Sequence, residues 1–476
     1  MSVGWKGIQK HRWLIGLYLL ALLIRLLPVY LFGRWEISLD MAQYHSLARS
    51  LAENRGYRWY TPEEATQFAK YLANFGVSAS LPSDPRGLPT SFRAPLYPFL
   101  LSLVYRLVAD QDQVFVARLV QAALGAGVAV MTYILALVID STQSQSKIAG
   151  GIVAFYTVLL FYPLGLVTEN LFIPLLLLNL IVLVIAAKSD RFSYSALAGF
   201  VAGLSALTRS LVVVTWPLQI WWLWKYRGGR SQALSHCLIF SLAMFLTTLP
   251  WSIRNSLLHK QPVWIESSLG YVLYLGYHPS STGIVQPVVT MQLISIQDDL
   301  VRNRIGMQAA LSFIRSNPSR AITQVAQRLG GLWAFDWRDF FYFYQNNFFG
   351  AWPPWLIIVT ILWLGIPLVF LIAAALYGLF MPPLKLEHTL LLGVIVCMML
   401  VHILTLADTR YHLPFVPLLA IFAAKGLTAG LNPSAVRKAF LASLPFWLIW
   451  GNEILSSWDR LLVLLAPGGN ATYLGY

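Results

Sequence analysis

Long apolar stretches alternate with short polar segments along almost the whole chain. A helix needs about 20 mainly apolar residues to cross the hydrocarbon core of a bilayer. Eleven stretches approach that length, at residues 13–32, 114–139, 148–167, 171–187, 196–208, 211–224, 234–252, 354–380, 389–406, 413–429 and 439–455. The pattern therefore predicts an all-α polytopic membrane protein with about eleven transmembrane helices.

A further apolar stretch, residues 94–109, decides the topology of all the helices after it. It is short, has two prolines near its start and carries Arg106. If it does not cross and the N-terminus is cytoplasmic, the short basic loops all face the cytoplasm, as the positive-inside rule expects. Those loops carry Lys147, Lys188, Arg191, Lys225, Arg227, Arg230, Lys385, Arg437 and Lys438. We therefore expect residues 94–109 to be re-entrant or interfacial, and the C-terminus to lie outside.

Two long polar segments, residues 33–112 and 253–353, then lie on the outer face of the cell membrane. The first is expected to hold two amphipathic helices that lie in the membrane interface. One covers residues 39–54 and stops before Gly56, because glycine commonly ends a helix. The other begins at Thr61-Pro62-Glu63-Glu64, which is a capping box with proline at the first helical position.

The second outer segment follows the seventh predicted span and is the larger loop. It begins with a Gly/Pro-rich part, residues 262–290, which we expect to be irregular. Two helical stretches follow and are separated at Asn317-Pro318. The predicted organisation is an N-terminal transmembrane module (residues 1–252, including the first outer loop), an extracytoplasmic loop region (253–353) and a C-terminal transmembrane module (354–476).

Composition and motifs argue against a soluble globular protein, a nucleic-acid-binding protein, a disulfide or zinc scaffold and an ATP-driven transporter. The chain is 57% hydrophobic and only 11% charged, whereas soluble domains contain roughly 25% charged residues. The net charge of +14 is explained by basic cytoplasmic loops, and without a contiguous basic tract we expect no nucleic-acid partner. Cys237 and Cys397 lie inside apolar runs, and the histidines lack zinc-ligand spacing. No phosphate-binding glycine loop stands in a strand–turn–helix context, which argues against ATP-driven transport.

Two acidic residues are candidates for catalysis. Asp40 begins the first interfacial helix, with Tyr44 one turn further on the same face; a helix cap is the alternative role for this aspartate. Glu169 lies between two apolar runs, where an ionisable side chain is costly and usually faces a cavity or a partner; a cap at a tight turn is its alternative. Because the predicted topology places both acids at the outer face, they could perform acid–base chemistry together.

Four arginines fall at the same outer membrane boundary. They are Arg93, Arg209, Arg254 and Arg410. Arginine keeps its charge and binds phosphate through two parallel hydrogen bonds, so the set is suited to a lipid-linked phosphate. The alternative for each arginine is a side chain that reaches towards lipid headgroups. Arg25, inside the first span, is interpreted as a structural or headgroup-directed residue.

The candidate residues stand in short motifs that follow one another along nearly the whole chain. They are Asp40-x-x-x-Tyr44, Arg93-Ala-Pro-Leu-Tyr97-Pro98, Thr168-Glu169-Asn170, Leu207-Thr208-Arg209, Pro250-Trp251-x-x-Arg254-Asn255 and Arg410-Tyr411-x-Leu413-Pro414. In this order they resemble the motifs of the GT-C type polytopic membrane glycosyltransferases. The resemblance is to the bacterial branch of the family that includes protein O-mannosyltransferases and the lipid A aminoarabinose transferase.

That resemblance implies an inverting glycosyltransferase of the cell membrane, with its active site on the outer side. Such enzymes move a sugar from a polyprenyl-phosphate carrier to a hydroxyl of a lipid, protein or glycan acceptor. It further implies that Asp40 is the general base and Glu169 a second catalytic acid. The implied substrate-binding residues are Tyr44, Arg93, Tyr97, Arg209, Arg254, Asn255, Arg410 and Tyr411. Many relatives carry a second acid where this chain has Met41, which leaves the use of a divalent cation open.

Two other functions on lipid-linked saccharides stay open. A flippase or transporter would need a polar path across the bilayer, and the predicted spans contain few charged residues. A glycan polymerase or ligase would share the general plan, and the large outer loop fits that function almost as well.

We predict that residues 94–109 do not cross the membrane. Cysteine substitutions at Gln111 and Gln143, each in a variant that lacks the two native cysteines, should then be labelled from opposite sides. Gln111 should react with an impermeant reagent added outside. Outside labelling at Gln143 in place of Gln111 would invert every later span and contradict the topology.

Overall fold

The chain folds almost entirely into helices, with strand pairing limited to one short hairpin. The computed structural model describes residues 12–35, 37, 40–73, 84–229, 231–282, 287–347 and 349–472. Within these ranges β1 (Arg58–Trp59) pairs antiparallel with β2 (Leu88–Pro89), and the other elements are helical. The predicted all-α class is therefore confirmed.

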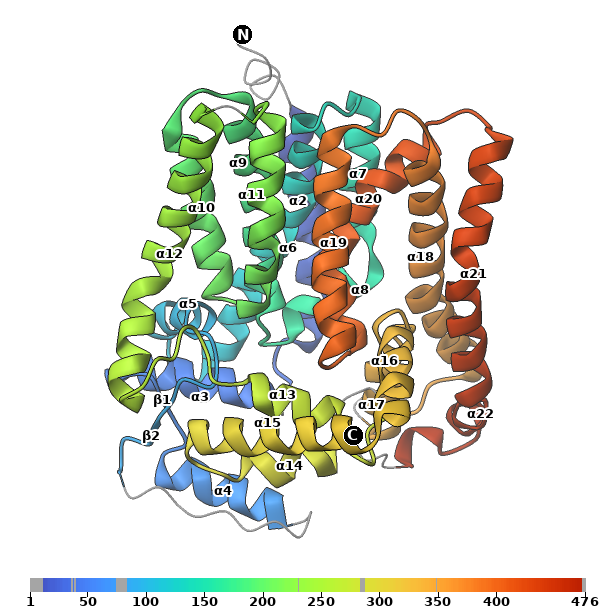
Figure 1. The fold of residues 1–476 in the computed structure, drawn as a ribbon. Coiled ribbons are helices and arrows are strands. Elements are labelled where there is room, and N and C mark those ends of the chain that lie inside the picture. Colours follow the sequence, from blue (N-terminus) through green and yellow to red (C-terminus); the bar gives the residue numbers. More distant parts are fainter. Residues whose placement is uncertain are drawn as a thin grey trace.

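The upright helices form the upper part of the molecule (Figure 1). They are α2 (Arg12–Phe32), α6 (Gln113–Val138), α7 (Gln143–Phe155) with α8 (Thr157–Phe161), α9 (Glu169–Lys188), α10 (Phe192–Ala206), α11 (Trp216–Tyr226), α12 (Ser231–His259), α18 (Pro354–Phe380), α19 (Leu386–Leu404), α20 (Val416–Leu427) and α21 (Pro433–Ser456). In the described part of the chain, six helices are long and apolar enough to cross a membrane, or seven if the bent pair α7–α8 is one span. This confirms a polytopic membrane protein, while the count of eleven spans stays a prediction.

Shorter helices gather at the lower end of the molecule (Figure 1). They are α3 (Asp40–Ala52), α4 (Pro62–Ala73), α5 (Leu96–Tyr105), α13 (Leu269–Gly276), α14 (Pro287–Ile294), α15 (Asp299–Ser316), α16 (Pro318–Leu332), α17 (Arg338–Gln345) and α22 (Trp458–Leu465). Both helices expected in the first outer segment are present as α3 and α4. The capping box of α4 is also present, since the backbone N–H groups of Thr61 and Glu64 donate to each other's side chains.

The second outer segment is more helical than its composition indicated. The split at Asn317-Pro318 is confirmed, because α15 ends at Ser316 and α16 begins at Pro318. Residues 262–290, however, contain α13 and the start of α14, so the expectation of an irregular segment was wrong there. Gly270 packs directly against the backbone of Asn303 in α15, and a Cβ atom would clash at that position. Glycine here permits close helix packing instead of breaking a helix.

The arrangement of the loops is consistent with the predicted topology. The ten-residue α5 is too short to cross a bilayer and packs beside α3 at the lower end. Basic loops contact one another: Lys188 Nζ lies 2.8 Å from Asp140 Oδ2, and Lys385 Nζ lies 3.2 Å from the Asp140 carbonyl oxygen. These loops lie at the upper end of the bundle, opposite the lower helices (Figure 1).

Candidate active site

Asp40 lies between two arginines that come from distant parts of the chain. It is the first residue of α3, while Arg93 precedes α5 and Arg410 belongs to the 3-10 turn η4 (Thr409–Phe415) that follows α19. Arg93 Nη2 donates to Asp40 Oδ1 at 2.6 Å, and Arg410 Nη2 donates to Asp40 Oδ2 at 2.9 Å. The Asp40 side chain is 31% exposed, so it can be reached from outside the protein.

The two arginines determine the charge of Asp40. Burial alone would raise the pKa of this carboxyl group, because it disfavours the charged form. The positive charges of Arg93 and Arg410 and their hydrogen bonds outweigh that effect and hold the pKa well below its usual value. Asp40 is therefore ionised at neutral pH, with both of its oxygens occupied.

Glu169 forms a second pair of acid and arginine. It opens α9, its side chain is 2% exposed, and it makes an ion pair with Arg209. The ring of Tyr411 connects this pair to the first one. The guanidinium carbon of Arg209 lies 5.1 Å from the centre of that ring, and that of Arg410 lies 5.4 Å from it. The structure thus brings both predicted acids into one network.

Tyr44 lies beside Arg93, and Tyr97 packs against Tyr44. The Arg93 guanidinium lies 5.3 Å from the centre of the Tyr44 ring. Tyr97 packs edge-on against Tyr44 and is fully buried, and its hydroxyl donates to Gln121 Oε1. Tyr44 therefore lies at the network, whereas Tyr97 supports it from behind. Contact of either tyrosine with a substrate stays a prediction.

Arg254 and Asn255 have partners inside the protein. Arg254 Nη1 donates to the Thr90 carbonyl at 2.6 Å, and its Nη2 donates to the Tyr57 carbonyl at 3.2 Å. Asn255 is fully buried and donates to the Ile265 carbonyl at 3.0 Å. Both residues hold the loops around the network, and their predicted contact with substrate remains untested.

Asp299 and Arg302 complete the support of Arg93, and neither residue was predicted from the sequence. Asp299 Oδ2 accepts from Thr90 Oγ1 at 2.7 Å and from the Ser91 backbone N–H at 2.6 Å. Arg302 forms a buried ion pair with Asp299. Helix α15 therefore holds the segment immediately before Arg93, although more than 200 residues separate the two in the sequence. No local pattern in an amphipathic helix distinguishes such an acid from a solvated one.

Arg410 is fixed by its own turn. The Asp408 side chain accepts from the Arg410 backbone N–H at 3.3 Å. His412 Nδ1 donates to the Leu332 carbonyl at 2.9 Å, and its Nε2 lies 3.3 Å from Asp336 Oδ2. The second outer segment, through Leu332 and Asp336, therefore also positions this arginine.

The structure distinguishes between the two roles considered for Arg25. The side chain is fully buried and donates to the carbonyls of Ala21, Val153 and Ala154. It connects α2 to α7 and is structural.

The arrangement does not favour a divalent cation at the network. Among the described residues no three His, Cys, Asp or Glu side chains group as metal ligands. Each oxygen of Asp40 already faces a guanidinium group, and Glu169 is paired with Arg209. Because positive charge repels a cation, the residues present do not fit a metal in this arrangement.

The chain is similar to known glycosyltransferases in sequence and in fold. Residues 92–252 match the sequence model of the family described as dolichyl-phosphate-mannose-protein mannosyltransferase. The structure resembles the oligosaccharyltransferase of Archaeoglobus fulgidus in its apo form, with a TM-score of 0.52 at 15% identity. That match covers 98% of this chain and 61% of the archaeal chain, so this chain spans about three fifths of its length.

A second solved structure is ArnT from Cupriavidus metallidurans bound to undecaprenyl phosphate. It matches with a TM-score of 0.49 at 13% identity, over 95% of this chain and 65% of that chain. No curated protein matches the chain significantly. The family match and the shared fold confirm the resemblance to GT-C type membrane glycosyltransferases.

We predict that Asp299→Ala destabilises the protein. The substitution leaves buried Arg302 without its carboxylate, and breaking such a pair costs about 3–5 kcal/mol. The midpoint of thermal unfolding in detergent should fall clearly. Arg304→Ala, which changes an exposed residue of the same helix, should leave the midpoint nearly unchanged. Equal midpoints for both variants would show that Asp299 does not hold the 90–93 segment.

Proposed function

We propose that this protein transfers a sugar from a polyprenyl-phosphate carrier to a hydroxyl acceptor at the outer face of the cell membrane. The observation that carries the proposal is Asp40 held between Arg93 and Arg410. Asp40 can act as the base for the acceptor hydroxyl, and the two arginines beside it can bind a phosphate, at one partly exposed site. The description of the matching family, which names a dolichyl-phosphate-mannose donor, supports the same substrate class.

The reaction is a single displacement with inversion at the anomeric carbon. Asp40 accepts the proton of the acceptor hydroxyl as the hydroxyl oxygen forms its bond to that carbon. The bond between the anomeric carbon and the phosphate oxygen breaks, and the electron pair leaves with the lipid phosphate. Arg410 and Arg209, which both lie near the ring of Tyr411, stabilise the charge that develops on the phosphate.

Donor binding makes Asp40 a better base. Without donor, both arginines lower the pKa of this carboxyl group, which makes it a weak base. A donor phosphate competes for the same guanidinium groups, because it presents acceptor oxygens of the same kind. As Arg410 turns to the phosphate, Asp40 loses one cation and its pKa rises. The base is therefore activated only when a donor is present.

Glu169 keeps Arg209 in place and limits the positive charge of the site. Its carboxylate is almost fully buried, so it serves the reaction through the arginine with which it pairs. We propose that the upper basic loops face the cytoplasm, as the positive-inside rule expects, with the N-terminus inside and the active site outside.

We predict that Asp40→Asn abolishes most of the activity while the fold is retained. Asparagine has the same size, keeps an oxygen that can accept from an arginine, and replaces a side chain that is only partly buried, so the protein should still fold. Turnover of a polyprenyl-phosphate sugar should fall about 10²–10⁴-fold, the usual contribution of a general base. Normal turnover in a stable variant would leave Asp40 only the structural role of pairing with Arg93 and Arg410.

We also predict that Arg410→Ala weakens donor binding. The loss should be about 1.5–3 kcal/mol, the worth of a hydrogen bond to a charged group, and it should appear as a raised KM for the lipid donor. Arg34→Ala removes another arginine at the outer boundary, whose side chain is 73% exposed, and should alter KM little. The same change in both variants would mean general attraction to lipid headgroups.

A further inference from the structure

A third acidic residue, Glu266, lies next to the network but outside the pairs described above. Its neighbour Ser267 donates its backbone N–H to the Ser91 carbonyl at 3.0 Å, two residues before Arg93. The Glu266 carboxylate itself accepts a hydrogen bond from Ser210, the residue that follows Arg209. Glu266 is therefore held between the two loops that carry these arginines.

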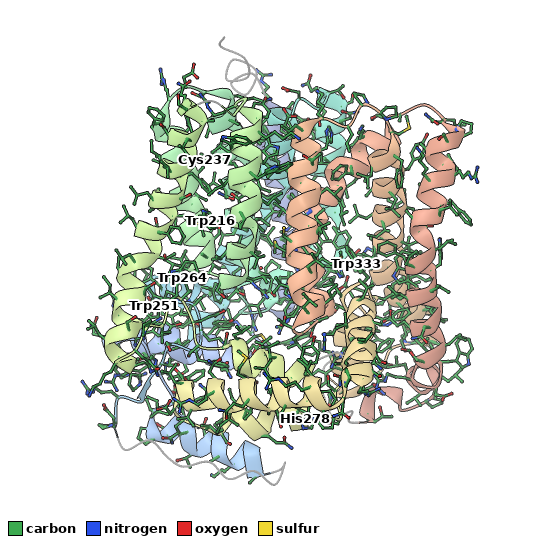
Figure 2. All side chains as sticks on the ribbon, in the orientation of Figure 1. Trp216, Cys237, Trp251, Trp264, His278 and Trp333 are labelled. Atoms are coloured by element: carbon green, nitrogen blue, oxygen red, sulfur yellow. The ribbon has the colours of Figure 1, made fainter. Side chains whose placement is uncertain are left out.

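The backbone around Glu266 is fixed from behind by the lower end of α12. Trp251 Nε1 donates to the Ile265 carbonyl at 2.8 Å, and Asn255 donates to the same oxygen. Trp264 Nε1 donates to Thr248 Oγ1 at 3.2 Å. Figure 2 shows Trp251 and Trp264 together beside this part of the helix. A side chain on so well-anchored a segment keeps a defined position, as a binding residue must.

Glu266 differs from Asp40 and Glu169 in its partners. In the described part of the chain, no lysine or arginine forms an ion pair with it, and its hydrogen bond comes from a neutral hydroxyl. It is only half-buried. Its charge acts on neighbouring groups: burial raises the pKa of the Tyr57 phenol, and the negative charge of Glu266 adds to this. Such a carboxylate repels phosphate but accepts hydrogen bonds from hydroxyl groups.

We propose that Glu266 binds hydroxyl groups of the sugar that is transferred, and so selects the sugar. The inference rests on the proposed function. The anomeric carbon must lie next to both the phosphate at Arg410 and the acceptor hydroxyl at Asp40. A sugar ring at that point would lie near Glu266, because Glu266 is held between the loops that carry Arg93 and Arg209. A site built to accept from sugar hydroxyls discriminates strongly, because a sugar without them leaves a carboxylate unpaired.

The test compares the binding of lipids with and without a sugar. Full-length wild type and Glu266→Gln, in nanodiscs, are titrated with undecaprenyl phosphate and with the same lipid carrying mannose, glucose or galactose. Wild type should bind one glycosylated lipid more tightly than the bare lipid. Glu266→Gln should lose about tenfold for that lipid, the worth of one hydrogen bond to a charged group, and nothing for the bare lipid. Glu63→Gln, at an exposed acid of α4, is the matched control and should behave as wild type.

Other outcomes distinguish a failure of the inference about Glu266 from a failure of the proposed function. If Glu266→Gln keeps the full preference for the sugar, or loses affinity for both lipids alike, Glu266 does not bind the sugar. If wild type prefers no glycosylated lipid, the inference is wrong, and if wild type binds no lipid phosphate at all, the proposed function fails as well.

Discussion

The site depends on one carboxylate shared by two guanidinium groups. Asp40, Arg93 and Arg410 come from three segments, and 370 residues separate the ends of one of the two ion pairs. Neither arginine stands alone: Thr90, Ser91 and Asp299 hold the loop of one, and Asp408 and His412 hold the turn of the other. The segments at the lower end of the molecule thus bring three charged side chains together, which would be costly inside the apolar upright helices.

In the proposed mechanism, the Asp40 carboxylate and the donor phosphate compete for the same arginines. The arginines neutralise Asp40 when no donor is present, which limits the cost of keeping three charged groups partly buried. A lipid phosphate offers the same guanidinium groups a second anion, and the carboxylate then gains basicity beside the bound sugar. On the proposed mechanism, one interaction would therefore couple donor binding to activation of the base.

The sequence predicted the parts of the structure that the membrane dictates. The two helices of the first outer segment and the grouping of Asp40, Glu169, Arg93 and Arg410 at one end of the bundle follow from hydrophobic length and the loop charges, while the interfacial position of these helices and the non-crossing α5 stay predictions. Long-range partners could not be predicted. Asp299 and Glu266 look like ordinary acids of polar segments until the fold places them beside Ser91 and Ser210, and Gly270 suggested a loop where it permits two helices to touch. Arg254 had the right type and depth for a phosphate ligand, yet its hydrogen bonds go to backbone carbonyls.

The most direct test of the shared carboxylate is the affinity of Asp40→Asn for undecaprenyl phosphate without a sugar. If Asp40 competes with the phosphate for Arg93 and Arg410, removing its charge should tighten binding, by about tenfold for one charge-assisted hydrogen bond released. The gain should shrink at high salt, because the competing interactions are electrostatic. Unchanged or weaker binding by the folded variant would contradict the account, since the arginines would then hold Asp40 and the phosphate independently.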